Sequence, residues 1–235
     1  MRRYKEKYII LDNDIAKRKS AIIELFTLPL AEQATMGNKN SIAYNHVANA
    51  DAFENMKHTP FNPVVVKSYE GYKKTLYKQW SFLRKQITFE AWQYSKGDNA
   101  YMNSKEMRDD ISQNKHLWVF TTNLSDPKLL PNHPMREELD SGVGGLTTFN
   151  DIFRGTHDVM GHWISDSSFS LMGEMTAWIA HRKTFSRSSH LALWCETRGQ
   201  AAWTNTYKNH SLMSAKDRPF AEQKTGIPEN WANFV

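Results

Sequence analysis

Residues 62–87 read NPVVVKSYEGYKKTLYKQWSFLRKQI and carry the clearest fold signal in the chain. Asparagine followed by proline at positions 62 and 63 is typical of a helix start, because the first side chain caps the helix and proline suits its first position. Apolar residues then recur in steps of three and four, at Val65, Tyr69, Tyr72, Leu76, Trp80, Leu83 and Ile87. This spacing predicts a long amphipathic helix.

Short strands are expected downstream of this helix. Residues 88–94 look extended, and residues 116–121, which begin HLWVF, read as a buried strand. Between them, Ser104 is a candidate cap for a helix that carries Met107 and Ile111. The expected fold is therefore mainly α, a single helical domain with a small amount of β.

The region before the long helix is the least regular part of the sequence. A short strand is expected at residues 9–11, a helix at 15–28 and a loop at 36–41, where asparagine, glycine and serine cluster. We therefore divide the chain into an irregular N-terminal arm or cap over residues 1–60 and a helical metal-binding domain over residues 61–235.

Composition limits the class of protein. The chain has 235 residues, a net charge of +5 and one cysteine, Cys195, so an internal disulfide framework is excluded and a reducing compartment, the cytoplasm, is expected. No apolar run is long enough to predict a membrane span. No Gly-x-Ser-x-Gly elbow or dinucleotide-binding fingerprint is present, and Gly142 to Gly145 reads as a turn.

Basic residues gather on the long helix, and they bear on possible partners. Lys73, Lys74, Lys78, Arg84 and Lys85 fall largely between its apolar positions. We interpret them as a solvated helix face, with contact to a nucleic acid as the alternative. A small-molecule substrate is the expected partner.

Two histidines stand out in the C-terminal half of the chain. Asn150 and Asp151 predict a helix start, and the helix would pass His157 and stop at Gly161, just before His162. In a continuous α-helix, side chains five residues apart point about 140° away from each other. A turn at the glycine would bring the second imidazole back, so the pattern predicts a His-x4-His metal chelate.

The third ligand is expected from one of two later helices, which are capped near Ser167–Ser168 and near Ser188–Ser189. The first helix carries Glu174 and His181 on one face, and the second carries Glu196, with Gln200 four residues further on the same face. We predict Glu196 as the third ligand and keep Glu174 as the alternative.

Two imidazoles and one carboxylate form the facial triad of non-haem iron(II) oxygenases, whose open positions serve oxygen and co-substrate. The same ligands around zinc would give a hydrolase. Residues expected to order the site or contact the substrate are Asp158, Glu174, His181, Arg198 and Gln200.

The segment from His157 to Phe169, HDVMGHWISDSSF, resembles the iron-binding segment of the aromatic amino acid hydroxylases. Trp194-Cys195-Glu196 resembles the context of that family's third ligand. The resemblance implies a largely helical fold, iron on His157, His162 and Glu196, and oxygen-dependent hydroxylation with a reduced pterin as electron donor.

A longer pattern resembles an uncharacterised family found in bacteriophages and bacteria, which implies the cytoplasm of a bacterial host if the chain is phage-encoded. The pattern comprises Asn150 to Arg154, His157-Asp158, Gly161-His162, Gly173-Glu174, Ala177-Trp178, His181, Glu196 to Gln200 and Trp203, with His116 to Phe120 and His133-Pro134 upstream. This resemblance implies a coherent domain without naming a reaction.

Two other functions remain open. A zinc or binuclear phosphohydrolase would need further ligands, for which His133, His181 and Asp151 are the candidates. A non-catalytic interaction protein with a structural metal would close its site with four protein ligands.

Overall fold

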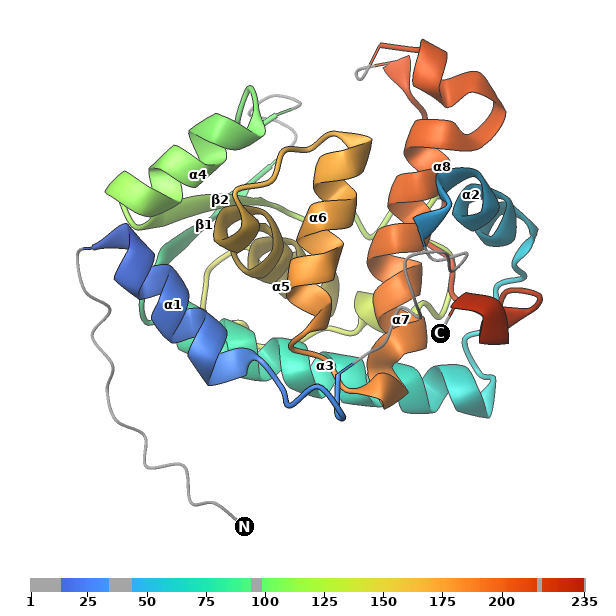
Figure 1. The fold of residues 1–235 in the computed structure, drawn as a ribbon, viewed down its shortest axis with the longest axis horizontal. Coiled ribbons are helices and arrows are strands. Elements are labelled where there is room, and N and C mark those ends of the chain that lie inside the picture. Colours follow the sequence, from blue (N-terminus) through green and yellow to red (C-terminus); the bar gives the residue numbers. More distant parts are fainter. Residues whose placement is uncertain (1–13, 34–43, 94–98, 215–216, 235) are drawn as a thin grey trace.

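The computed structural model describes residues 14–33, 44–93, 99–214 and 217–234 (Figure 1). It is mainly helical with one small two-stranded sheet, as predicted. The helix predicted from residue 62 is α3 (Pro63–Leu83), whose first turn is capped by the Asn62 side chain. Its apolar face is fully buried, whereas Lys74, Lys78 and Arg84 are exposed, which agrees with the solvated-face interpretation.

The sheet consists of β1 (Thr88–Trp92) and β2 (His116–Phe120), which run parallel with Thr88 opposite His116. Parallel neighbours need a crossover connection, and α4 (Ser104–Gln113) lies in it. The cap of α4 is Asn103, whose side chain accepts from the amides of residues 105 and 106, so the sequence prediction of Ser104 was one residue late.

The described part of the N-terminal region is more regular than expected. It forms α1 (Ile15–Phe26) and α2 (His46–Asn55), while the predicted strand at 9–11 and the loop at 36–41 lie outside the described residues. Ile22 of α1 and Phe53 of α2 are buried in the core. Both helices are therefore packed parts of the domain.

The C-terminal half supplies most of the remaining helices. In chain order they are α5 (Phe149–His157), the π-helix η4 (Asp158–Trp163), α6 (Leu171–Arg182), η5 (Arg187–Ser189), α7 (His190–Leu193), the π-helix η6 (Trp194–Gly199), α8 (Gln200–Thr206), η7 (Tyr207–Leu212) and η9 (Trp231–Phe234); η3 (Pro134–Arg136) precedes them. Figure 1 shows α6 between α5 and the rod formed by α7 and α8. Within the described ranges, no helix has the length and apolar character that a membrane crossing needs.

The caps of these helices differ slightly from the sequence predictions. Thr148 caps α5 in a reciprocal capping box with Asp151, so the helix begins before the expected Asn150. Ser170 caps α6, just after the cap expected near Ser167–Ser168. A Cβ on Gly199 would lie 2.6 Å from Phe53 Cδ2, so the missing side chain lets η6 pack closely against α2.

Candidate metal centre

The two histidines share one face because the helix changes its pitch between them. We expected Gly161 to end the helix; instead α5 continues into η4 without a break, and the chain is π-helical from Asp158 to Trp163. A π-turn closes hydrogen bonds from residue i to residue i+5, so residues five apart lie above one another. His157 and His162 thereby become neighbours, with ring centroids 5.2 Å apart.

Gly161 has a packing role rather than a terminating one. A Cβ at this position would lie 3.1 Å from the Ala177 Cβ on α6 and 3.1 Å from His157 Cε1. The missing side chain therefore lets η4 approach α6 closely. This approach brings the histidine face of one helix against the first turns of the other.

The acid that α6 presents to the histidines is Glu174. His162 Nε2 lies 3.3 Å from Glu174 Oε1, and His157 Nε2 lies 3.8 Å from Glu174 Oε2. One ligand atom from each of the three residues falls within 4.8 Å of the others, and no other such group occurs among the described residues. Ligand atoms held about 2.0–2.2 Å from one ion at right angles are about 3 Å apart, so this donor set fits a metal ion.

Glu196, the predicted third ligand, lies in a different group of contacts. Its Oε1 accepts a hydrogen bond from the Tyr69 hydroxyl and is 3.3 Å from His133 Nε2. Its Oε2 accepts from Gln200 at 3.4 Å, which confirms that residues 196 and 200 share a face. The carboxylate is 4% exposed and does not belong to the His157–His162 group. The geometry thus favours the alternative, Glu174.

The charges of the triad perturb one another. Burial opposes ionisation of Glu174, but the nearby His162 and His157 lower the pKa of its carboxyl to about 2. Burial also opposes the charged form of His162, but Glu174 and then Asp158 raise the pKa of this imidazole above its usual value. Each of the two residues therefore favours the charged form of the other.

Asp158 stands beside the triad, as expected for the residue that follows a ligand. Burial raises the pKa of its carboxyl to about 6, although His162 and His157 act in the opposite direction. The side chain is partly exposed. Asp158 can therefore hold or release a proton near neutral pH at the edge of the site.

The outer nitrogens of both imidazoles have partners. His162 Nδ1 lies 3.1 Å from Ser167 Oγ, and His157 Nδ1 lies 3.1 Å from His181 Nδ1. Burial lowers the pKa of His181 well below its usual value, so its ring is uncharged. Such contacts orient ligating histidines, which agrees with the role expected for His181. Ser167 was expected only as a helix cap, so its contact with His162 was missed.

Other predicted site residues lie elsewhere. Arg198 is buried and donates to His46 Nδ1 of α2 at 3.0 Å. Asp151 accepts four hydrogen bonds, from the Thr122 amide and hydroxyl and from the amides of residues 147 and 148, so its oxygens serve the start of α5. His133 lies against Glu196. Among the described residues, none of the further ligands expected for a binuclear hydrolase therefore joins His157, His162 and Glu174.

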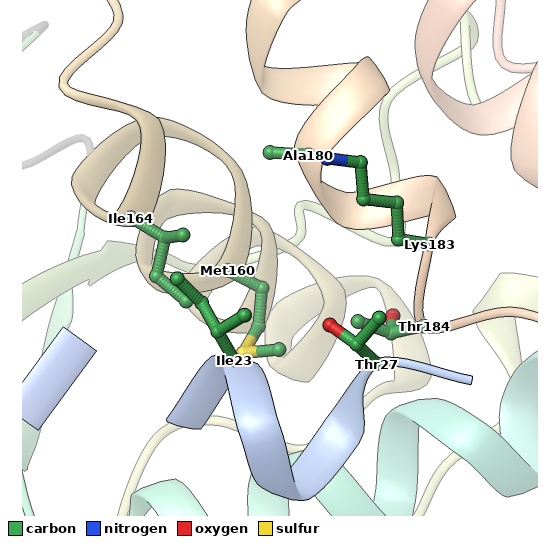
Figure 2. Close-up of a pocket in the computed structure, with 7 residues that line it drawn as sticks. All are labelled: Ile23, Thr27, Met160, Ile164, Ala180, Lys183 and Thr184. Atoms are coloured by element: carbon green, nitrogen blue, oxygen red, sulfur yellow. The ribbon is translucent and has the colours of Figure 1, made fainter. Parts of the chain in front are cut away.

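A small cavity of about 70 Å³ lies behind the π-turn, between α1, η4 and the end of α6 (Figure 2). Its lining is mostly apolar and comprises Ile23, Thr27, Met160, Ile164, Ala180, Lys183 and Thr184. Since ligand pockets usually measure about 300–1,000 Å³, this cavity is too small for an organic substrate. Phe169 packs edge-on against His162 with ring centroids 5.0 Å apart, and its side chain is 43% exposed.

No family model matches the chain, and no curated protein or solved structure matches it significantly. The residues of the triad are therefore the basis for the function proposed below.

Proposed function

We propose that this protein is a non-haem iron(II)-dependent oxygenase that hydroxylates a small molecule, with iron held by His157, His162 and Glu174. The observation that carries the proposal is the convergence of one ligand atom each from His157, His162 and Glu174 within 4.8 Å of one another. Only three protein ligands gather there among the described residues, which suits a catalytic rather than a closed structural site.

Iron(II) with two imidazoles and one carboxylate supplies oxygen activation at its remaining positions. The chain supplies the surroundings. Glu174 contributes one negative charge, and the Ser167 and His181 contacts hold the imidazoles in place. Asp158 takes or gives a proton at its carboxyl oxygen, and Phe169 offers an apolar ring to the substrate. The resemblance to the aromatic amino acid hydroxylases makes a reduced pterin the first electron donor to test.

A zinc-dependent hydrolase is the second candidate, and Asp158 favours it. Burial raises the pKa of this carboxyl to about 6 in the metal-free protein, and its place beside the triad would let it take a proton from a metal-bound water. In this candidate the same three residues would hold the ion.

The test is to load metal-free protein with iron(II) under anaerobic conditions and add nitric oxide, which occupies the oxygen position of such centres. We expect about one iron per chain and the EPR signal of a high-spin iron–nitrosyl complex. The double variant His157→Ala, His162→Ala should give neither. Tightly held zinc that iron does not displace, with no nitrosyl signal, would instead support the hydrolase.

A further inference from the structure

The helix that carries both histidines ends in a Schellman motif, which folds the chain back onto His162. Asp166 has the left-handed backbone of this motif, with φ 54°, and the Ser167 amide donates to the His162 carbonyl oxygen at 3.1 Å. The Asp166 amide donates to the Trp163 carbonyl oxygen at 3.5 Å. The motif therefore returns Ser167 to His162, where Ser167 Oγ lies 3.1 Å from the imidazole Nδ1.

A further contact ties Ser167 to a different element. Arg108 of α4 donates from Nη1 to the Ser167 carbonyl oxygen at 2.6 Å. Because the donor is a charged guanidinium, this hydrogen bond is stronger than one from a neutral group. Ser167 is buried, so little water can replace the donor if it is lost. Arg108 therefore fixes the backbone of the residue whose hydroxyl contacts His162.

The helix that carries Arg108 is itself firmly packed. Met107 and Ile111 of α4 are fully buried. One residue further along, Ser112 Oγ accepts a hydrogen bond from Trp163 Nε1 of η4 at 2.9 Å. Arg108 therefore reaches the Schellman motif from a helix that is already fixed against η4.

We propose that Arg108 is a positioning residue, which acts through Ser167 to hold the His162 ring in the orientation that turns its Nε2 toward Glu174. The hydrogen bond fixes the peptide group after Ser167 and with it the direction of the Ser167 side chain. Without this bond the turn and the imidazole gain freedom, and a metal ion has to order both. The inference rests on the proposed metal site, but the contacts exist in the metal-free protein.

The first arm of the test compares Arg108→Met with Lys105→Met. Methionine keeps an aliphatic stem but has no N–H group. Lys105 is a matched control, because it lies one turn earlier on α4, its side chain is 76% exposed and it pairs with Asp109. We expect cobalt(II) to bind Arg108→Met about 10–100-fold more weakly than wild type and with a changed visible spectrum, and Lys105→Met to match wild type.

A merely structural role would lower the free energy of unfolding, measured with urea, without changing the spectrum of bound cobalt. Arg108→Lys, which restores a charged donor, should recover part of the affinity. Equal affinity and an unchanged spectrum in folded Arg108→Met would overturn the proposal. Circular dichroism checks folding.

The second arm is a double-mutant cycle with Ser167→Ala. If Arg108 acts through the Ser167 hydroxyl, Ser167→Ala should weaken cobalt binding by a similar factor. Adding Arg108→Met to Ser167→Ala should then have little further effect, because the two changes break the same connection. Two losses of affinity that multiply would show that Arg108 does not act through Ser167.

The third arm needs no metal. In metal-free wild type and Lys105→Met, we expect nuclear Overhauser effects between the Ser167 β-protons and the His162 ring, and weaker ones in Arg108→Met. Their absence from wild type would overturn the proposal. If wild type binds neither cobalt nor iron, the proposed function fails while this contact still decides the role of Arg108. If wild type and Arg108→Met bind metal equally, the role of Arg108 fails and the triad stands.

Discussion

Glu174 and His162 form an ion pair in the absence of metal, with His162 Nε2 and Glu174 Oε1 3.3 Å apart. The pair lowers the pKa of the carboxyl to about 2 and raises that of the imidazole. A divalent ion must displace the imidazole proton to bind, because a ligating histidine has to be neutral. Protons and metal ions therefore compete at this residue.

This competition predicts how metal affinity depends on pH. Because the pKa of His162 is raised above 6.5, it holds its proton to a higher pH, and affinity should fall on acidification even before pH 6.5 is reached. Glu174 stays ionised in this range. Zinc affinity between about pH 6 and 8, measured against a competing chelator, should decrease by at least about tenfold per pH unit below the His162 pKa, because both ligating imidazoles must be neutral. An affinity independent of pH would contradict the assignment of His162.

The residue pattern predicted part of the site. His157 and His162 were recognisable because their spacing is local, and Glu174 with His181 was expected on one helix face. The choice between Glu174 and Glu196 depended on which helix packs against the histidines. The packing of these helices is a tertiary contact, which depends in part on the close approach of Gly161 to Ala177. The spacing of residues within one helix does not predict such a contact.

At the scale of elements, the decisive feature is the π-turn of η4. The sequence suggested that the helix ends at Gly161, because glycine is common at helix ends. In the structure, α5 continues into η4 without a break. A second π-helix, η6, carries Glu196 and Arg198. The backbone hydrogen bonds of both π-helices join residues five apart. Apolar residues that recur in steps of three and four do not reveal such bonds, so the sequence alone could not predict either π-helix.

Gly161→Ala tests the contact between η4 and α6. The added methyl would lie 3.1 Å from the Ala177 Cβ and 3.1 Å from His157 Cε1, so α6 and the His157 ring must each give by a few tenths of an ångström. We expect a loss of about 1–3 kcal/mol in the free energy of unfolding, measured with urea, together with weaker metal binding.

Gly144→Ala is the matched control, because a Cβ at Gly144 meets nothing within 4 Å. It should change the free energy of unfolding by no more than about 0.5 kcal/mol and leave metal binding intact. If the two alanine variants behave alike, the close approach of η4 to α6 does not matter for the site.

Across the whole molecule, α3 joins the two parts of the core. Its first half packs in one apolar cluster through Tyr69, Tyr72 and Leu76, and its last turns pack in the other through Trp80 and Leu83. The periodicity of residues 62–87 predicted this buried face. From the same helix, the Tyr69 hydroxyl donates a hydrogen bond to Glu196, and the Gln79 side chain contacts His181. One helix therefore contacts both the surroundings of Glu196 and the histidine behind the triad.

In the proposed metal site, Glu174 is the third ligand and Glu196 is not. The most direct measurement is an anaerobic titration of iron(II) into wild type, Glu174→Gln and Glu196→Gln, two changes that remove one charge each with little change in shape. We predict one ion per chain for wild type and for Glu196→Gln, and binding weakened by about 100-fold or more for Glu174→Gln. Binding lost in Glu196→Gln but retained in Glu174→Gln would contradict the assignment.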